Sequence, residues 1–200
     1  MNELVTRYLA ALKKAYPPAH AALAPNGAVL PNEAPDMDCA VALYAAHDGQ
    51  GPDGQFPPNV WDGFRWLNVR GIASTREMLD GMVKKGEWDD KTTKLVDHWA
   101  PGWIPILSNG CGDHVVIDSA GTFTGKRGQI IQFRHDDGFR PGIAPSFDAW
   151  FAVWVESLEA GMWTIDAGMA SLWNTEASTA LFAQRMPGYP LGHKVKRIPR

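Results

Sequence analysis

The chain has 200 residues, of which 45% are hydrophobic and 20% charged, and this is typical of one folded domain rather than a disordered segment. Its formal net charge of -3 offers no broad basic surface, which argues against a general nucleic-acid-binding role. No apolar run reaches the ~18–20 residues of a membrane span and the N-terminus lacks the apolar core of a signal peptide, so we expect a cytoplasmic protein that enters no membrane.

The first third of the chain predicts two helices. Apolar side chains recur at helical spacing from the N-terminus to about Tyr16, and the proline pair at 17–18 stops the pattern. An irregular, proline-rich segment then leads to Asp36, which is a suitable N-cap for a helix reaching Asp48. Gly49 is the expected left-handed residue after that helix.

The next segment predicts a short strand and two more helices. Residues 60–69 are rich in aromatic and β-branched side chains, which favours a strand. Ser74 and Glu77 have the spacing of a capping box, which predicts a helix over residues 75–86. Residues 91–99 are compatible with a further short helix.

The segment that follows predicts a small sheet covered by a helix. Three apolar runs, 103–107, 114–118 and 128–134, are each bounded by Gly, Asn or Asp turn residues, and short connections favour an antiparallel meander. Ser146 is a suitable N-cap for an amphipathic helix that ends near Gly161. One broad aromatic face of this helix is expected to cover the sheet.

The C-terminal part predicts less order. Residues 175–185 are expected to form a helix, and the Lys- and Arg-containing residues 187–200 a loosely attached tail. Together the patterns predict one α+β domain with a curved, mostly antiparallel sheet flanked by helices. We assign residues 1–165 to this domain and residues 166–200 to a partly helical extension with a basic tail.

The two cysteines, Cys39 and Cys111, are far apart and have no CxxC spacing, so we expect packed, reduced thiols rather than a zinc knuckle or a disulfide framework. Cys111 lies in a glycine-rich turn, and neither a helix start nor a histidine spaced to activate it is identifiable. Residues 122–128 contain Gly, Lys and Thr but lack the order of a phosphate-binding loop. We therefore predict no nucleophile and no nucleotide site.

Two His-Asp pairs, at 47–48 and 135–136, are the residue types that bind divalent metals in phosphohydrolases. The same residues are also common in turns, where they satisfy backbone groups, and this interpretation is favoured. Asp113 and Asp118 are expected on opposite sides of a strand, which argues against paired catalytic carboxylates. The sequence thus predicts no catalytic residue, no metal and no cofactor, with a metal-dependent hydrolase as the least favoured alternative.

Several segments together carry a family resemblance. In chain order they are HDGQ at 47–50, GFRWL at 63–67, GWIPIL at 102–107, NGCGDHVVID at 109–118, GQIIQFRHDD at 128–137 and APSFDAWFAVWVESLEAG at 144–161. Over about residues 29–161 the chain resembles the SUKH superfamily, specifically its yeast cell-wall assembly regulator (killer-toxin-resistance) branch. It departs from that pattern at Cys111, where members often carry glycine.

The resemblance implies an α+β fold with a curved sheet and no enzymatic activity. It implies a structural role for the motif residues His47, Gly49, Trp103, Pro105, Gly112, Asp113, Gly128, Gln129, His135, Asp136, Ser146, Phe147 and Trp150. Bacterial members are mostly immunity proteins that neutralise toxins, whereas fungal members regulate cell-wall synthesis through protein contacts. Our first hypothesis is an immunity protein that binds a cognate toxin, and the alternative is a regulatory or scaffold protein.

A partner surface is expected at the rim of the sheet and its loops. Aromatic anchors beside charged groups suit an interface, although such aromatics are as often core residues. The predicted partner-binding residues are Asp48, Asp53, Trp61, Asp62, Phe64 and Trp66. If the partner were a basic toxin, Glu87, Asp89 and Asp90 would extend the acidic surface, although a charge run is more often simply a solvated face.

Overall fold

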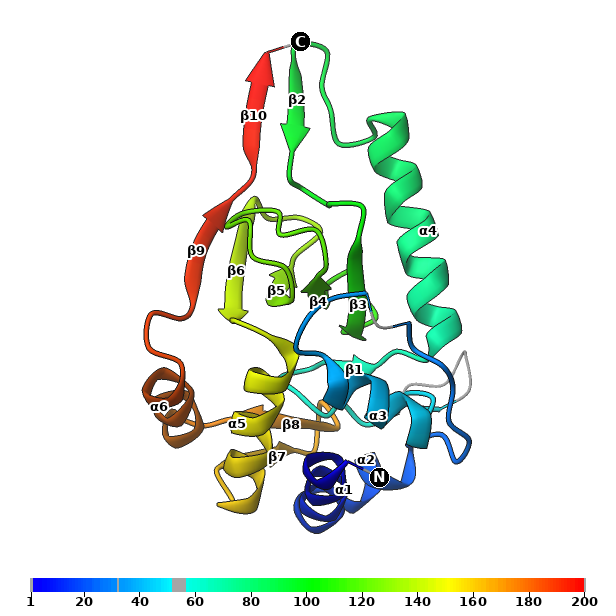
Figure 1. Cartoon of the computed structure of the whole chain (residues 1–200), viewed down its shortest axis with the longest axis vertical. Coiled ribbons are helices and arrows are strands. Elements are labelled where there is room, and N and C mark those ends of the chain that lie inside the picture. Colours follow the sequence, from blue (N-terminus) through cyan, green and yellow to red (C-terminus); the bar gives the residue numbers. More distant parts are fainter. Residues whose placement is uncertain (1, 32, 52–56, 200) are drawn as a thin grey trace.

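The computed structural model describes residues 2–31, 33–51 and 57–199, and the described residues form one α+β domain (Figure 1). The helices are α1 Glu3–Ala15, α2 Pro17–Ala21, α3 Asp38–Ala46, α4 Val69–Lys85, α5 Phe147–Glu159 and α6 Glu176–Arg185. The strands are β1 Arg65–Trp66, β2 Thr93–Val96, β3 Trp103–Ser108, β4 His114–Asp118, β5 Gln129–Phe133, β6 Phe139–Ala144, β7 Trp163–Asp166, β8 Ser171–Asn174, β9 Leu191–Lys194 and β10 Lys196–Pro199.

The central sheet has the strand order β1-β3-β4-β5-β6-β9, and every neighbouring pair is antiparallel. The predicted meander of β3, β4 and β5 is confirmed. Strand β6 was not predicted, because Pro141 and Gly142 have the residue types of a turn. Proline cannot donate to a strand ladder and is unusual between two paired strands, yet β6 lies between β5 and β9.

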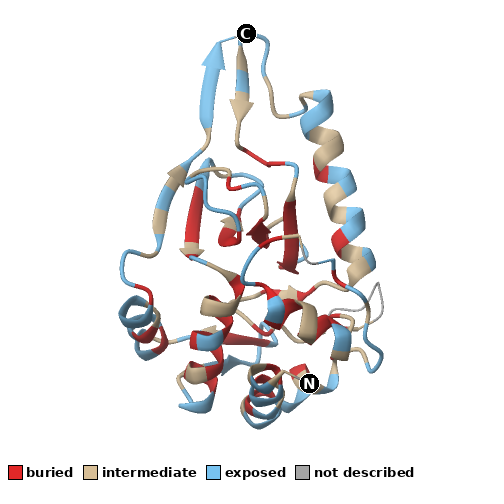
Figure 2. Ribbon diagram, in the orientation of Figure 1, coloured by how far each residue is buried: buried red, intermediate tan, exposed pale blue. Residues whose placement is uncertain are grey.

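The two faces of the sheet bury different cores, because side chains alternate along a strand. The first face carries Val115, Ile117 and Ile130, which share a large core with α1, α3 and α5. The second face carries Val116, Ile131, Phe133 and Trp103, which pack with Leu79 of α4 and with Trp99. Figure 2 shows the central strands as largely buried and much of the α4 surface as exposed.

Helix α5 forms as predicted and covers the first face. Its N-cap Ser146 accepts a hydrogen bond from the amide of Ala149 at 3.2 Å, and Gly161 follows the helix with φ of 69°. The apolar residues of the predicted face are all buried: Phe147, Trp150, Phe151, Trp154, Val155 and Leu158.

Helices α1 and α3 form close to the predicted positions, but the predicted cap of α3 is wrong. The N-cap is Met37, and Asp36 has a positive φ of 52° outside the helix. The amide of Cys39 donates instead to the carboxylate of Asp148 on α5, at 2.9 Å. The cap is therefore supplied by a residue that is distant in sequence. The proline pair that ends α1 also begins the short helix α2, as proline's fixed φ allows.

Helix α4 begins earlier than predicted, and the proposed capping box is wrong. Its N-cap is Asn68, whose side chain accepts from the amide of Gly71 at 2.6 Å. Ser74 lies inside the helix, where its hydroxyl donates to the carbonyl of Gly71 at 3.1 Å. The strand expected over residues 60–69 is reduced to the two residues of β1. Gly86 ends α4 in the left-handed conformation, as predicted.

The helix predicted over residues 91–99 is also wrong, because this segment forms β2. Strand β2 pairs antiparallel with β10, and β9 forms an edge of the central sheet. Residues 191–194 and 196–199 are thus held by strand pairing, so the prediction of a loosely attached tail is wrong. Strands β2 and β10, together named the arm here, extend beyond the central sheet in Figure 1. The division into residues 1–165 and 166–200 stays a prediction.

Among the described residues, no helix combines the length and apolar character that crossing a membrane requires.

Candidate functional site

A cavity of about 530 Å³ opens on the first face of the sheet. Strands β4, β5 and β6 form one wall, and α5, α6 and the loop over residues 61–64 form the others. Buried residues such as Phe64, Val115 and Trp150 contribute to its lining. Pockets of roughly 300–1,000 Å³ with apolar walls and a few polar groups are the usual form of ligand sites. The cavity is therefore the candidate functional site.

The sheet contributes polar groups to this cavity through the alternation of its strands. Val115 on β4 and Gln132 on β5 are Cα partners across the two strands. Residues two apart share a face, so Gln132 and Arg134 lie on the same side as Ile130, above an otherwise apolar surface. Arg134 is exposed and lies 3.8 Å from Asp137, a distance that leaves its guanidinium only loosely held.

Helix α6 contributes one of its faces. Thr179, Phe182, Ala183 and Met186 line the cavity, and this i, i+3, i+4, i+7 spacing places them on one side of the helix. A reciprocal capping box between Thr175 and Ser178 fixes the start of the helix.

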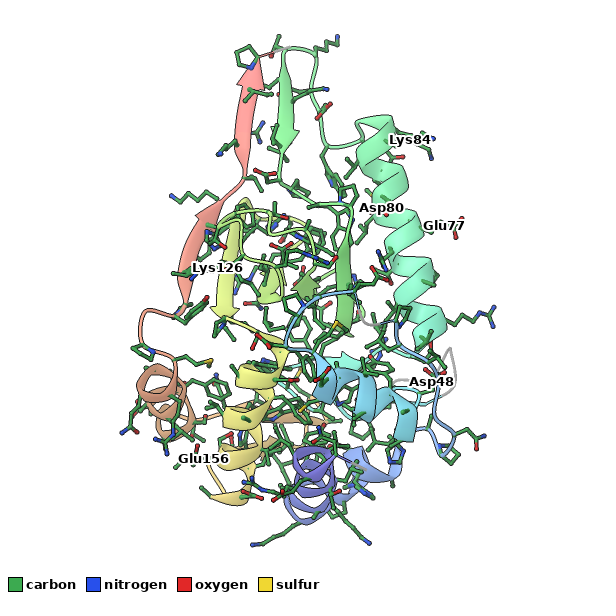
Figure 3. The ribbon with its side chains drawn as sticks, viewed as in Figure 1. Asp48, Glu77, Asp80, Lys84, Lys126 and Glu156 are labelled. Atoms are coloured by element: carbon green, nitrogen blue, oxygen red, sulfur yellow. The ribbon has the colours of Figure 1, made fainter. Side chains whose placement is uncertain are left out.

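The far end of α6 is tied to α5. Arg185 on α6 pairs with Glu156 on α5, with Nη2 and Oε1 separated by 2.6 Å. Glu156 is labelled in Figure 3 on the side of α5 that faces α6. The ion pair thus ties the C-terminal end of this cavity wall to α5.

The loop over residues 61–64 is anchored to β8. The amide of Asp62 donates to the carbonyl of Leu172 at 2.9 Å, and its carboxylate accepts from the amide of Asn174 at 2.8 Å. Asp62 has a positive φ of 40°, which aspartate tolerates better than most residues. Burial raises the pKa of the Asp62 carboxyl. A carboxyl group is therefore held rigidly on the wall opposite the sheet.

Aromatic rings make the interior of the site stiff. The ring of Trp61 lies 4.8 Å from that of Trp150, 5.0 Å from that of Trp163 and 5.3 Å from that of Phe182, measured between centroids. The ring pairs are edge-on or tilted, and these arrangements give a favourable interaction between the ring quadrupoles. Contacts with several neighbouring rings restrict the rotation of the Trp61 side chain.

Comparison with known proteins places this fold in a family. The model of the SMI1 / KNR4 family (SUKH-1) matches residues 38–153, more than half of the chain. The chain belongs to the SMI1/KNR4 family. The matched segment contains the sheet wall and the loop wall of the cavity, whereas β8 and α6 lie beyond it.

Named relatives agree with this assignment. A KNR4/SMI1 homolog of Yarrowia lipolytica is 30% identical over 105 residues, which are 52% of this chain and 15% of that protein. The cell wall biosynthesis/cell cycle regulator smi1 of Schizosaccharomyces pombe is 26% identical over 152 residues, 68% of this chain and 30% of that protein. The cell wall assembly regulator SMI1 of Saccharomyces cerevisiae is 35% identical over 63 residues, 32% and 12% respectively. Each match thus covers less than a third of the relative's length.

Three of the six residues predicted to bind a partner meet at the cavity of this SUKH-1 chain, namely Trp61, Asp62 and Phe64. The prediction that Trp66 binds a partner is wrong. Trp66 is 2% exposed and its Nε1 donates to the hydroxyl of Tyr8 at 2.8 Å, so it is a core residue.

The remaining acidic residues of that prediction lie elsewhere. Asp48 accepts from the amide of Val69 at the start of α4, and Figure 3 shows it on the opposite side of the view from Glu156. Asp90 accepts from the amides of Thr92 and Thr93 at the start of the arm. Glu87 and Asp89 precede it in the same connection after α4. Asp53 lies outside the described residues.

Several of the SUKH-1 motif residues make contacts that stabilise the fold. Nδ1 of His47 lies 2.7 Å from the carbonyl oxygen of Ala24, and a Cβ at Gly49 would lie 2.4 Å from the carbonyl oxygen of Leu67. The indole of Trp103 donates to Thr122 at 2.9 Å. Pro105 lies at the register shift between β3 and β4.

The other motif glycines and polar groups shape turns. Gly110 and Gly112 have positive φ angles of 78° and 103°, as expected for a glycine-rich turn. Cys111 in this turn is exposed, so the expectation of a packed thiol is wrong for Cys111. Gly128 has a positive φ of 95°, and a Cβ at this position would lie only 2.7 Å from the carbonyl oxygen of Pro35. Both features favour glycine. Gln129 is buried and its amide donates to Thr124 at 2.8 Å.

The two His-Asp pairs do not form one site. His47 and Asp48 make the backbone contacts just described, far along the chain from His135, which instead pairs with Asp113. Asp113 accepts from the amide of His135 at 3.0 Å and lies 2.8 Å from its Nδ1, which links two turns. Ligand atoms of Asp113, His135 and Asp136 lie within 4.8 Å of one another, on an exposed surface. This trio is not the quartet that the hydrolase alternative required.

Sequence reasoning missed Gln132, Arg134, Asn174 and the cavity face of α6. The sequence did contain a signal for Gln132 and Arg134. They are two positions apart in an apolar strand, so they place polar side chains on a face where apolar ones are expected. No signal linked α6 to the loop over residues 61–64, since they are more than 100 positions apart and meet only in the fold.

Proposed function

We propose that this chain is a non-catalytic protein-binding module of a regulatory protein, and that a partner protein docks over the cavity on the first face of the sheet. The observation that carries the proposal is a rigid, aromatic-walled cavity whose rim holds Asp62, Gln132, Arg134 and Asn174. Interfaces of this kind have aromatic anchors at the centre and polar groups at the rim. The regulator names of the relatives support the regulatory part.

The names of the relatives favour the regulatory alternative over our first hypothesis, an immunity protein that neutralises a toxin. The three relatives described above are named as regulators or as their homologs. The local roles of the polar motif residues support a non-catalytic module, because Asp113, His135 and Gln129 stabilise turns.

Affinity purification of the tagged chain from the cells that make it, followed by mass spectrometry, tests this function. We expect endogenous regulatory proteins to be enriched over a purification with an unrelated domain of similar size and charge. Enrichment of a single toxin, with protection from that toxin on co-expression, would instead restore the immunity hypothesis. If no protein is enriched at all, the protein-binding proposal is wrong.

A further inference from the structure

We infer that the cavity receives an extended segment of the partner, which inserts one large apolar side chain and presents its backbone amides to the polar rim. This inference rests on the proposed function and specifies the chemistry of its binding site. Three features of the cavity lead to it: its size, its depth toward the core and the chemistry of its rim.

The size of the cavity fits a side chain together with its flanking backbone. A cavity of about 150 Å³ holds one benzene molecule, and this cavity, at about 530 Å³, is more than three times larger. A single aromatic or long aliphatic side chain would therefore leave room for the adjoining main chain. Buried Val115 and Trp150 in the lining show that the space reaches the core, which is the depth that an anchor side chain needs.

The rim combines donors with acceptors and carries both signs of charge. Gln132 can donate and accept, and its side chain makes no hydrogen bond with another described residue. Arg134 provides a cation on the sheet wall, and Asp62 a carboxyl on the loop wall.

This pairing disfavours a simply charged small molecule. A ligand with a single charge would pair with one of these two groups and leave the other without a counter-charge. A peptide backbone is neutral overall and offers N–H and C=O groups in alternation, which matches such a rim.

The segment between α6 and β9 also contributes to the cavity wall. Tyr189 and Pro190, between α6 and β9, form part of its lining. The partner's segment would extend this wall over the open side, between the rim residues of α6 and Gln132 of the sheet.

A steric block with a matched control tests the inference. Ala183 is exposed at the rim on α6, so Ala183→Trp should fill the opening without disturbing the core. Ala177 is exposed on the same helix but six residues earlier, about 120° around the axis from Ala183. Ala177→Trp therefore adds the same ring outside the cavity. Circular dichroism and thermal melting would confirm that both variants fold. If Ala183→Trp does not fold, Thr179→Trp serves as the blocking variant in its place.

The probe is a phage-displayed library of random peptides, panned against the chain and followed by fluorescence polarisation with synthetic copies of the enriched peptides. We expect these peptides to share one large apolar residue, whose change to alanine weakens binding about tenfold or more. Ala183→Trp should weaken binding by a similar factor and Ala177→Trp should leave it unchanged. Gln132→Leu, which removes an amide contact, should weaken binding about fivefold.

Two results would overturn the inference: no peptide is enriched, or the enriched peptides bind Ala183→Trp as tightly as the unchanged chain. Repeating the affinity purification with Ala183→Trp separates this inference from the proposed function. Partners that are retained by Ala183→Trp would leave the protein-binding function standing and reject the cavity as its anchor site. Partners that are absent even with the unchanged chain would reject the protein-binding function itself.

Discussion

Acidification is expected to destabilise this protein through His98, which lies beside Arg140. His98 is 5% exposed, and its Nδ1 lies 3.0 Å from Nη2 of the buried Arg140. A guanidinium can only donate, so Nδ1 accepts and the imidazole is neutral, with its proton on Nε2. Protonation of Nδ1 would replace this hydrogen bond with two facing cations. Burial first, and the charge of Arg140 second, lower the pKa of His98 to about 4.

The sign and size of the effect follow from linkage. Between the ordinary histidine pKa of 6.5 and the folded value of about 4, the unfolded chain binds a proton that the folded chain does not. Stability therefore falls as the pH falls through this window. For His98 alone the loss is about 2 kcal/mol at about pH 5 relative to about pH 7.5. Burial likewise lowers the pKa of His114, which is 5% exposed, to about 4, so the pair together accounts for about 4 kcal/mol.

Urea denaturation of the unchanged chain and of His98→Asn, at about pH 5 and about pH 7.5, measures this effect. Asparagine retains an acceptor near the position of Nδ1 but does not titrate. The loss of stability on acidification should therefore be about 2 kcal/mol smaller in His98→Asn.

His135→Asn is the control, because His135 is exposed and its hydrogen bond to Asp113 raises its pKa. Its stabilising contribution is present at low pH and is lost as the pH rises, so removing it should not reduce the acid loss. If His98→Asn loses as much stability on acidification as the unchanged chain, the buried neutral imidazole is not the cause.

Three further predictions concern packing, capping and thiol access. Tyr8→Phe removes the acceptor of the Trp66 indole N–H, a contact of 2.8 Å in the core, and should cost about 1–3 kcal/mol in urea denaturation; an unchanged unfolding free energy would contradict this role. Ser146→Ala removes the side-chain cap of α5 and should lower the unfolding free energy by about 1 kcal/mol. Cys111 is exposed, whereas Cys39 is buried and burial raises its pKa to about 12, so Ellman's reagent should titrate one thiol in the native protein and both in denaturant. Rapid reaction of both native thiols would show that Cys39 is accessible.

The sequence predicts best those elements whose signals are local. Helix α5 follows from Ser146 and its aromatic face, and α6 from the helical pattern of residues 175–185. The turn that carries Cys111 follows from its glycines, because their positive φ angles suit that residue type. In each of these cases the stabilising partner lies within a few positions along the chain.

Elements that depend on distant partners were assigned incorrectly. Strand β2 is formed by pairing with β10, about 100 positions later, and no local preference of residues 91–99 indicates that pairing. The start of α3 is capped by Asp148, whereas the local rule favoured Asp36. Tertiary hydrogen bonds outweigh a weak local preference of this kind, since one cap or one propensity difference is worth only about 1 kcal/mol.

Residues beyond the family match, which ends at residue 153, are integral to the candidate site. Helix α6 supplies one wall of the cavity, and the main chain of β8 holds the Asp62 loop. A domain cut at the end of the match would retain Gln132 and Arg134 on the sheet and the loop over residues 61–64. It would lose α6 and the β8 main chain that holds this loop. In the proposed function, the sheet and the loop over residues 61–64 are therefore the parts of the site within the family match. Helix α6 and strand β8, which close the anchor pocket, are the parts from which this chain's choice of partner would arise.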